Sequence, residues 1–178
     1  MNRDRDAALI VISGLPRTGK SALAREVALH LGAVHLSIDA AEEALLAAGL
    51  TRDWTTGVAA YEVTGALAAF NLQLGRVVVV DAVNDTEVAR STWHREAKAE
   101  ATPLAFVVTT CSDANEHRRR LSSRSRSFDN VREPTWDDVQ RRAATFEPPV
   151  EPHILLDTIE PLSSLPPRAL TALRVGEG

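Results

Sequence analysis

Cysteine, long apolar runs and metal-type histidine spacing are missing or scarce in this chain of 178 residues, and each absence excludes a class of protein. The single cysteine, Cys111, cannot form an internal disulfide or build a cysteine metal cluster. No run of about 18 apolar residues, as a membrane-spanning helix requires, occurs. The five histidines show no ligand-type spacing. Residues 1–6 mix both charges and do not resemble a secretory signal, so we expect a cytoplasmic protein that spans no membrane.

Charged residues are distributed unevenly along the chain. The net charge of -4 argues against a nucleic-acid partner, yet five arginines and no acidic residue lie between residues 117 and 126. Hydrophobic residues make up 44% and charged residues 25%, which are ordinary globular values. The length suits one domain, so we predict a single domain over residues 1–178 with a mobile, arginine-rich lid over about 120–134.

Short apolar runs alternate with helical patterns along the chain. The predicted strands are residues 8–13, 34–38, 77–80, 104–110 and 153–156. The predicted helices are residues 21–31, 39–48, 58–74, 85–100, 113–124, 135–146 and 166–173. This alternation predicts an α/β fold with a five-stranded parallel sheet and helices on both faces. Ligands of such sheets bind at the carboxyl ends of the strands.

A phosphate-binding loop joins the first strand to the first helix. Its residues are Gly14, Leu15, Pro16, Arg17, Thr18, Gly19, Lys20 and Ser21, which match G-x-x-x-x-G-K-[ST]. The glycines allow successive N–H groups to face phosphate oxygens, and the following helix N-terminus attracts anions. Lys20 supplies a positive charge for the phosphates and the Ser21 hydroxyl a ligand for Mg²⁺. We therefore expect the chain to bind ATP and Mg²⁺.

Absent signatures narrow the class of this phosphate-loop protein. The third strand ends in Asp81-Ala82, which lacks the glutamate that activates water in motor-type ATPases, and no N-K-x-D guanine signature occurs. Arg120 and Arg124 are spaced i, i+4 before the lid, so one helix face presents both to a single anion. This is typical of a small kinase whose lid closes over ATP.

The chain resembles the small P-loop kinases of the nucleotide-kinase type, and most of all the group related to chloramphenicol phosphotransferase, polynucleotide kinase and zeta toxins. The segments that carry the resemblance are GLPRTGKS, LSIDAAEEAL, GRVVVVDAVND, HRRRLSSR and ATFEPP before HILLDT. The resemblance covers nearly the whole chain and implies a five-stranded parallel sheet that binds MgATP.

The resemblance also implies roles for two aspartates. Asp39, at the end of the second strand, would orient the acceptor hydroxyl or take its proton; alternatively, it is only the cap of a helix in the capping box Asp39-Ala-Ala-Glu42. Asp81 would order the Mg²⁺ ligands, or it is simply an aspartate that begins a loop. Asn84 is either the N-cap for Glu87 or a substrate contact.

The arginines carry alternative interpretations. Arg120 and Arg124 either neutralise phosphate charge or flank the adenine, or they belong to a solvated basic face. Arg132 is a candidate second lid arginine, and Arg17 either faces solvent or holds a substrate anion. Similar kinases often carry Asp-x-x-Arg after the second strand; here Glu42 takes the fourth position, which favours a cationic or uncharged acceptor.

Aromatic residues form only 4% of the chain, and four of them fall near the expected acceptor pocket, which suggests a ring-bearing or apolar acceptor. These are Trp54, Tyr61, Phe70 and Trp93. Phe70 and Trp93 are expected in the core, whereas Trp54, in a polar loop, is the better pocket candidate. Cys111 is expected to be a small buried hydrophobic residue.

Three functions follow from these patterns. The leading hypothesis is an ATP-dependent phosphotransferase that acts on a hydroxyl of a small molecule, with Lys20, Asp39, Arg120 and Arg124 as catalytic residues. The second is a kinase of a nucleotide or a nucleic-acid 5′ end, which the acidic remainder of the chain disfavours. The third is a nucleotide-switched regulatory protein with little transfer. The sequence indicates neither the acceptor nor the oligomeric state.

Overall fold

In a computed structural model, which describes residues 7–123 and 129–175, five parallel strands form one sheet in the order β2-β3-β1-β4-β5. The strands are β1 (Leu9–Gly14), β2 (Val34–Ser37), β3 (Val78–Asp81), β4 (Leu104–Thr110) and β5 (His153–Asp157). The predicted fold class and all five predicted strands are confirmed, with each strand end within one residue of its expected position. The strand order places β1, and the phosphate loop that follows it, at the centre of the sheet.

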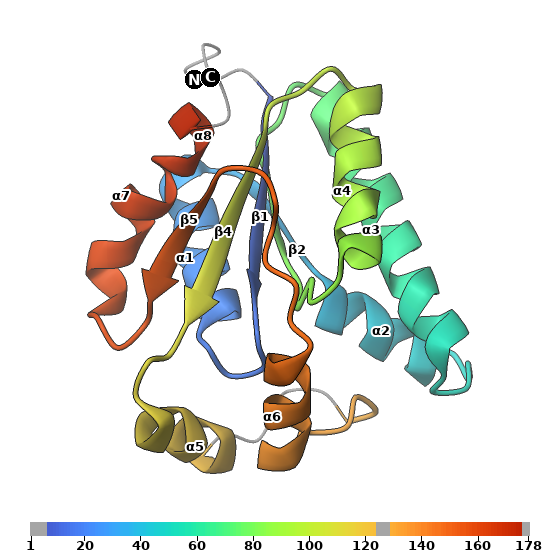
Figure 1. Ribbon diagram of the computed structural model, residues 1–178. Helices are drawn as coiled ribbons and strands as arrows, with labels where there is room; N and C mark the ends of the chain where they lie inside the picture. The colour runs from blue at the N-terminus through green and yellow to red at the C-terminus, as the bar shows by residue number, and fades with distance from the viewer. Residues whose placement is uncertain (1–6, 124–128, 176–178) are drawn as a thin grey trace.

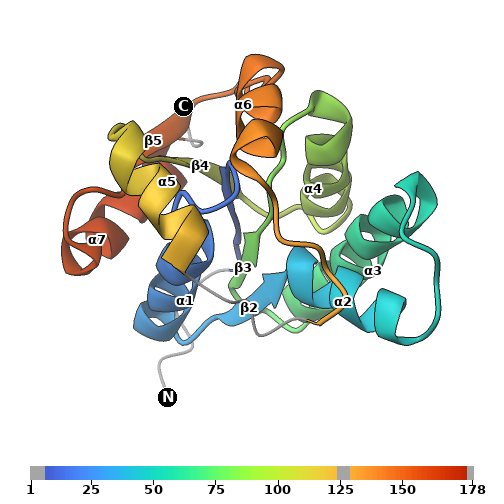
Figure 2. The same cartoon turned by 90° about the horizontal axis from the view of Figure 1, so that it is seen from below.

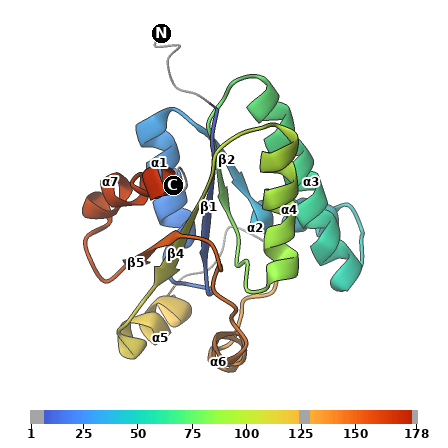
Figure 3. The ribbon, with the colours of Figure 1, turned by 45° about the horizontal axis from the view of Figure 1, so that its top comes forward.

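Helices cover both faces of this sheet (Figures 1 and 3). On one face lie α1 (Lys20–Leu31), α7 (Leu165–Ala169) and α8 (Ala172–Val175), with the 3₁₀ turn η1 (Leu162–Ser164) before α7. On the other face lie α3 (Trp54–Gln73) and α4 (Glu87–Ala99), with α2 (Ile38–Ala47) packed against α3. The remaining helices, α5 (Ala114–Ser123) and α6 (Trp136–Ala144), lie beyond the carboxyl ends of the strands (Figure 2).

The alternation of side chains along β1 explains why its sequence is apolar throughout. Ile10 and Ile12 pack with Val27 of α1 on one face, while Leu9 and Val11 belong to the core on the other face. Because both faces are covered, neither set of alternating positions meets solvent. The sheet is therefore a rigid central platform whose carboxyl edge carries the loops of the site.

The third helix begins earlier than the periodicity predicts. Asp53 is its N-cap and its side chain accepts a hydrogen bond of 2.9 Å from the Thr56 N–H, so α3 starts at Trp54 rather than at residue 58. Trp54 is thus helical and 78% exposed, not part of a polar loop. Phe70 is 65% exposed, so the prediction that it lies in the core is wrong, whereas Trp93 is fully buried as expected.

At Asp39 and Asn84 the sequence left a helix cap open as an alternative, and both of these alternatives are wrong. The N-cap of α2 is Ser37, and Asp39 lies within the first turn, so the capping-box alternative for Asp39 fails. The N-cap of α4 is Thr86, whose hydroxyl accepts from Ala89 N–H at 3.2 Å. Asn84 is instead fully buried. Its side chain donates to Ser13 Oγ at 3.0 Å and accepts from Trp93 Nε1 at 2.8 Å, which joins β1 to α4.

The C-terminal part of the chain differs from the expected single helix. The predicted helix over residues 166–173 is two short helices, α7 and α8, after η1. Leu165 and Ala169 are fully buried against the α1 face, so this segment closes the core next to β5. Within the described parts of the chain, no helix has the length and apolar character needed to cross a membrane.

Candidate active site

The phosphate loop is built on backbone conformations that its glycines make possible. Gly14 has a φ of 151°, and a Cβ there would lie 2.3 Å from Thr109 Oγ1, so a side chain does not fit. Gly19 caps α1 at a φ of 88° and offers no side-chain cap to the first turn. The N–H groups of that turn and the helix dipole therefore face the loop, which suits a phosphate anion.

Three threonines fix the loop against the ends of β4 and β5. The Thr18 hydroxyl donates to Leu15 O at 2.8 Å and lies 2.8 Å from the Thr109 hydroxyl. Thr158, directly after β5, donates to the backbone oxygen of Thr18 at 2.7 Å. These hydrogen bonds restrain the loop, and a restrained loop loses less conformational entropy when it binds a ligand.

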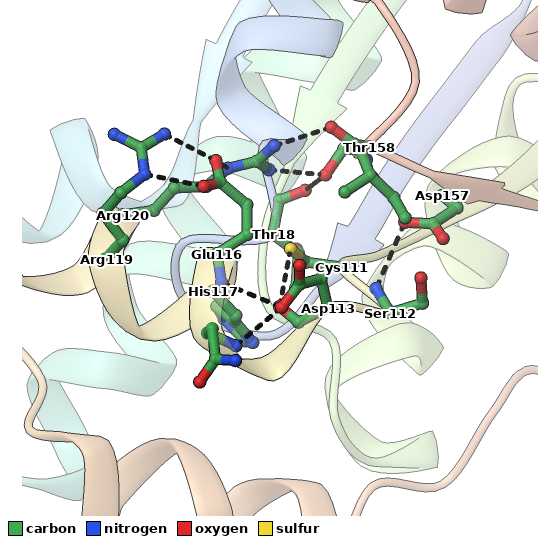
Figure 4. A network of polar contacts seen from close by, with 12 residues as sticks. Thr18, Cys111, Ser112, Asp113, Glu116, His117, Arg119, Arg120, Asp157 and Thr158 are labelled. Carbon is green, nitrogen blue, oxygen red and sulfur yellow. Dashed lines mark hydrogen bonds and ion pairs between the residues drawn. The ribbon is translucent and has the colours of Figure 1, made fainter.

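Arg120 of α5 is attached to the same network. It donates to Thr158 Oγ1 at 2.8 Å and to the Thr158 carbonyl at 2.7 Å, and its Nε donates to Glu116 at 2.8 Å (Figure 4). The guanidinium groups of Arg119 and Arg120 lower the pKa of Glu116 to about 2. Arg120 is therefore held beside the phosphate loop by neutral and acidic partners and does not belong to a freely solvated basic face.

Asp81 and Ser21 lie together at the end of β3, as expected for a metal-binding pair. Ser21 Oγ donates to Asp81 Oδ1 at 2.7 Å, and His35 Nε2 donates to Asp81 Oδ2 at 2.7 Å. Burial raises the pKa of Asp81, but the hydrogen bond from His35 and the charge of Lys20 outweigh it, so the net pKa lies below the ordinary value. Asp81 is 1% exposed and remains a carboxylate at neutral pH.

This donor set fits Mg²⁺ bound together with a nucleotide. Hydroxyl and carboxylate oxygens are the ligands that Mg²⁺ prefers, and it usually takes one or two of them together with phosphate oxygens. Among residues 7–123 and 129–175, no cluster of three or more histidines, cysteines or acids forms a complete cage for a metal. The site therefore suits a metal that arrives with its phosphate ligands.

Two cavities of about 390 Å³ each flank the phosphate loop. The first lies next to Pro16 and the second next to Arg17 and Gly19; we name them the acceptor-side cavity and the base-side cavity after the roles proposed for them below. The base-side cavity is lined by Arg17, Gly19, Ala22, Arg120, Thr158, Ile159, Glu160, Leu162 and Leu165. Its mixture of apolar side chains with the guanidinium groups of Arg17 and Arg120 suits a planar base.

The acceptor-side cavity contains Asp39 and is strongly charged. Its lining consists of Pro16, Asp39, Glu42, Arg52, Val83, Val131, Arg132, Glu133, Pro134, Asp138, Arg141 and Arg142. Part of this charge is already neutralised, because Asp138 pairs with Arg141 and Glu133 pairs with Arg17. Arg142 is 3.9 Å from Asp85. This lining favours a polar ligand.

None of the four aromatic residues that fall near the expected pocket, including the candidate Trp54, belongs to the described lining of the cavity. Trp93 is buried against Tyr61, with ring centroids 5.8 Å apart, and Trp54 and Phe70 face solvent. Tyr61 contacts the loop after β3, where its hydroxyl accepts from the Asn84 N–H at 3.3 Å. The suggestion of a ring-bearing or apolar acceptor is therefore not supported by the cavity.

The structure also places two further arginines and the cysteine that the sequence singled out. Arg17, left open by the sequence, has a side chain only 9% exposed and pairs with Glu133 rather than facing solvent. Arg132 lines the acceptor-side cavity 3.9 Å from Asp138. Cys111 is half-buried rather than buried, and this partial burial raises its pKa. Arg124, like the lid segment over 124–128, lies outside the described residues.

Sequence patterns missed several residues of the site. Thr158 carries a local signal, since it directly follows a strand at the carboxyl edge of the sheet. His117 does not; its Nε2 donates to the Pro16 carbonyl at 2.8 Å, and its ring meets Trp136 edge-on at 5.4 Å. His35 carries no local signal either, because it contacts Asp81 of the neighbouring strand, which lies 46 positions away in the sequence.

Comparisons with known proteins agree with this geometry. A family model described as AAA domain, AAA_33, matches residues 9–149, which span the phosphate loop, Asp39, Asp81 and α6. No curated protein sequence gives a significant match.

Solved structures share the fold over nearly the whole chain. A gluconokinase from Sinorhizobium meliloti 1021 has a TM-score of 0.71 at 21% identity and covers 97% of this chain and 95% of its own. The APS kinase CysC of Mycobacterium tuberculosis, in complex with AMPPNP and APS, has a TM-score of 0.72 at 16% identity, covering 95% and 98%. Kti12 of Chaetomium thermophilum, in complex with ADP-AlF3, has a TM-score of 0.67 at 20% identity, covering 93% and 98%.

Proposed function

The chain belongs to the AAA_33 family and has the fold of the small P-loop kinases, and from that premise we propose that it transfers the γ-phosphate of MgATP to a hydroxyl of a small polar molecule. The observation that carries the proposal is the position of the phosphate loop between two cavities of similar volume. One cavity suits the base of a nucleotide, and the other contains a carboxylate, Asp39. A phosphoryl group on the loop would lie at the boundary between donor and acceptor.

The phosphate loop and the base-side cavity would bind the nucleotide. The base would lie against Arg120 and Leu162, and the phosphates against the N-terminus of α1 and Lys20. Lys20 is 4% exposed, so its charge acts in a region from which water is largely excluded. Ser21 and Asp81 would hold Mg²⁺, which supplies charge neutralisation on the phosphate oxygens when bound.

Asp39 would act on the acceptor. Its carboxylate would accept a hydrogen bond from the acceptor hydroxyl and take its proton as the oxygen attacks the γ-phosphorus. The new oxygen–phosphorus bond forms as the bond from the γ-phosphorus to the β–γ bridging oxygen breaks, and ADP leaves. Asp39 lies in the first turn of α2, and its position in the lining of this cavity is what supports the role.

The lining of the acceptor-side cavity revises the expected charge of the acceptor. Glu42 alone favours a cationic or uncharged molecule, but Arg52, Arg132 and Arg142 share the same cavity. A volume of about 390 Å³ is at the small end of the range for ligand sites. We therefore expect a small acceptor with several polar groups, which pair with both carboxylates and guanidinium groups.

The experiment that tests this proposal traces the labelled γ-phosphate of ATP into its products. The protein is incubated with Mg²⁺ and γ-labelled ATP in a small-molecule cell extract and, separately, with 5′-hydroxyl oligonucleotides, and the products are separated. We expect the label in a small organic phosphate. Label only in oligonucleotides would favour the nucleic-acid kinase, and label confined to ATP or free phosphate would favour a regulatory ATP-binding protein; either result would overturn the proposal.

Variants assign the roles within the same assay. Asp39→Asn should retain ATP binding while transfer falls on the order of a hundredfold or more, because the acceptor loses its base. Lys20→Ala should abolish transfer, since the phosphates lose a buried positive charge. Asp137→Asn, an exposed carboxylate of α6 that does not line the cavity, is the matched control and should be silent. An Asp39→Asn protein that is less stable but fully active would show that Asp39 is structural.

A further inference from the structure

One carboxylate on α2 holds three consecutive backbone N–H groups from a distant segment. Glu43 accepts from the N–H of Asp129 at 3.2 Å, of Asn130 at 2.9 Å and of Val131 at 2.9 Å. The side chain of Asn130 adds a fourth donor at 2.7 Å. Burial pushes the pKa of Glu43 upward, but these hydrogen bonds outweigh it and lower the pKa, so the side chain stays charged at neutral pH. A charged acceptor strengthens each of the contacts.

This segment, residues 129–134, which we term the strap, forms one wall of the acceptor-side cavity. It runs from α6 alongside α2 in the view of Figure 2. Val131, Arg132, Glu133 and Pro134 all line the cavity. Val131 is buried, and its backbone is one of the three held by Glu43, so the carboxylate acts directly on a wall residue.

A second attachment joins the strap to the phosphate loop. The guanidinium group of Arg17 pairs with the Glu133 carboxylate, and the Arg17 side chain is 9% exposed. The strap is thus fixed to α2 at one end and to the nucleotide-binding loop near the other. Because Asp39 also belongs to α2, one turn before Glu43, the attachment at Glu43 determines how far the strap stands from Asp39.

We propose that Glu43 is a positioning residue for the acceptor: it fixes the strap against α2 and so sets the width of the cavity opposite Asp39. This inference rests on the proposed phosphotransfer. Glu43 does not line the described cavity and touches neither the loop nor Asp81 in the contacts above, so its effect on transfer runs through the strap. Loss of the carboxylate should therefore weaken acceptor binding without weakening nucleotide binding.

The first test is hydrogen exchange of the strap amides, which needs no acceptor. Glu43→Gln replaces one of the two acceptor oxygens by a donor that faces N–H groups. We expect exchange at residues 129–131 to rise on the order of tenfold, while exchange in β1 is unchanged. The matched control is Glu62→Gln on α3, which weakens an exposed pairing with Arg95 of α4; neither residue lines the cavity. Unchanged exchange at residues 129–131 would overturn the inference.

The second test measures transfer to the labelled organic phosphate at a series of extract dilutions and ATP concentrations. Glu43→Gln should raise the extract concentration needed for half-maximal transfer roughly tenfold, with the maximal rate and the KM for ATP within about twofold of wild type. The Glu43→Asp variant, whose side chain is one methylene shorter, should need an extract concentration between those of the wild type and Glu43→Gln. Equal half-saturation in wild type and Glu43→Gln would overturn the inference and leave the proposed function standing. A wild-type protein that labels no organic product would overturn the proposed function, and the acceptor role of Glu43 with it.

Discussion

Gly14 offers a test of the phosphate loop in which the cost can be worked out from the structure. A Cβ at this position would lie 2.3 Å from Thr109 Oγ1 and 2.7 Å from both the Thr109 carbonyl and Thr18 Oγ1. Thr109 cannot simply turn away, because its hydroxyl donates to Ser13 O at 3.0 Å and its carbonyl belongs to β4. Overpacking of this kind costs roughly 1–3 kcal/mol, and the φ of 151° adds roughly 1–3 kcal/mol of strain for any other residue.

Gly14→Ala should therefore lower the free energy of unfolding by roughly 2–6 kcal/mol and weaken ATP binding at least tenfold. Gly32→Ala is the control: its φ of 62° is also positive, but nothing lies within 4 Å of a Cβ there. It should cost only about 1–2 kcal/mol and leave ATP affinity unchanged. Urea unfolding and calorimetric ATP titration measure both effects. If Gly14→Ala is as stable as Gly32→Ala and binds ATP normally, the loop is not held as described.

Two further predictions concern buried charge. Arg90 is 1% exposed and donates to the carbonyls of Asn84 and Glu147 and to the Glu87 carboxylate. Arg90→Met should therefore lower the free energy of unfolding by roughly 3–5 kcal/mol. A loss below about 1 kcal/mol in urea unfolding would contradict this. Asp81 has a lowered pKa, so its contribution to stability is present above the ordinary value near 3.9 and is lost as the pH falls toward the folded-state pKa. Asp81→Asn should therefore lose less stability than wild type as the pH falls below about 4, and parallel stability curves would show that Asp81 is not held as a carboxylate.

Features of the fold that depend on residues close together in the sequence were predictable, whereas features that depend on residues far apart were not. Strands such as β1 and β4 are predictable because their apolar character follows from burial on both faces, a property of each strand alone. The caps of α3 and α4 depend on single hydrogen bonds at Asp53 and Thr86, and competing candidates a few residues away look equally good in sequence. Asn84 illustrates the difficulty, since its partners Ser13 and Trp93 come from two other elements.

In the candidate site, too, residues with a local sequence signal were predictable, and contacts between distant segments were not. The phosphate loop, Asp39 and Asp81 were predictable because strand ends and a contiguous motif mark them locally. The pairing of Arg17 with Glu133 spans 116 positions, and the contact of Arg120 with Thr158 spans 38, so no local pattern indicates either. The error at Phe70 has a similar origin, because only the packing of α3 against α2 and α4 decides which face of the helix is covered.

The sequence by itself determined the parallel sheet, the phosphate loop at its centre and the carboxylates at the ends of β2 and β3, because hydrophobic periodicity and the glycine motif act over a few residues. Only the tertiary structure decided that the loop separates two cavities and that Glu43 fixes the strap against α2. The physical reason is that a cavity and its walls are made by side chains from elements far apart in the chain. Their relative positions follow from the packing of the whole domain.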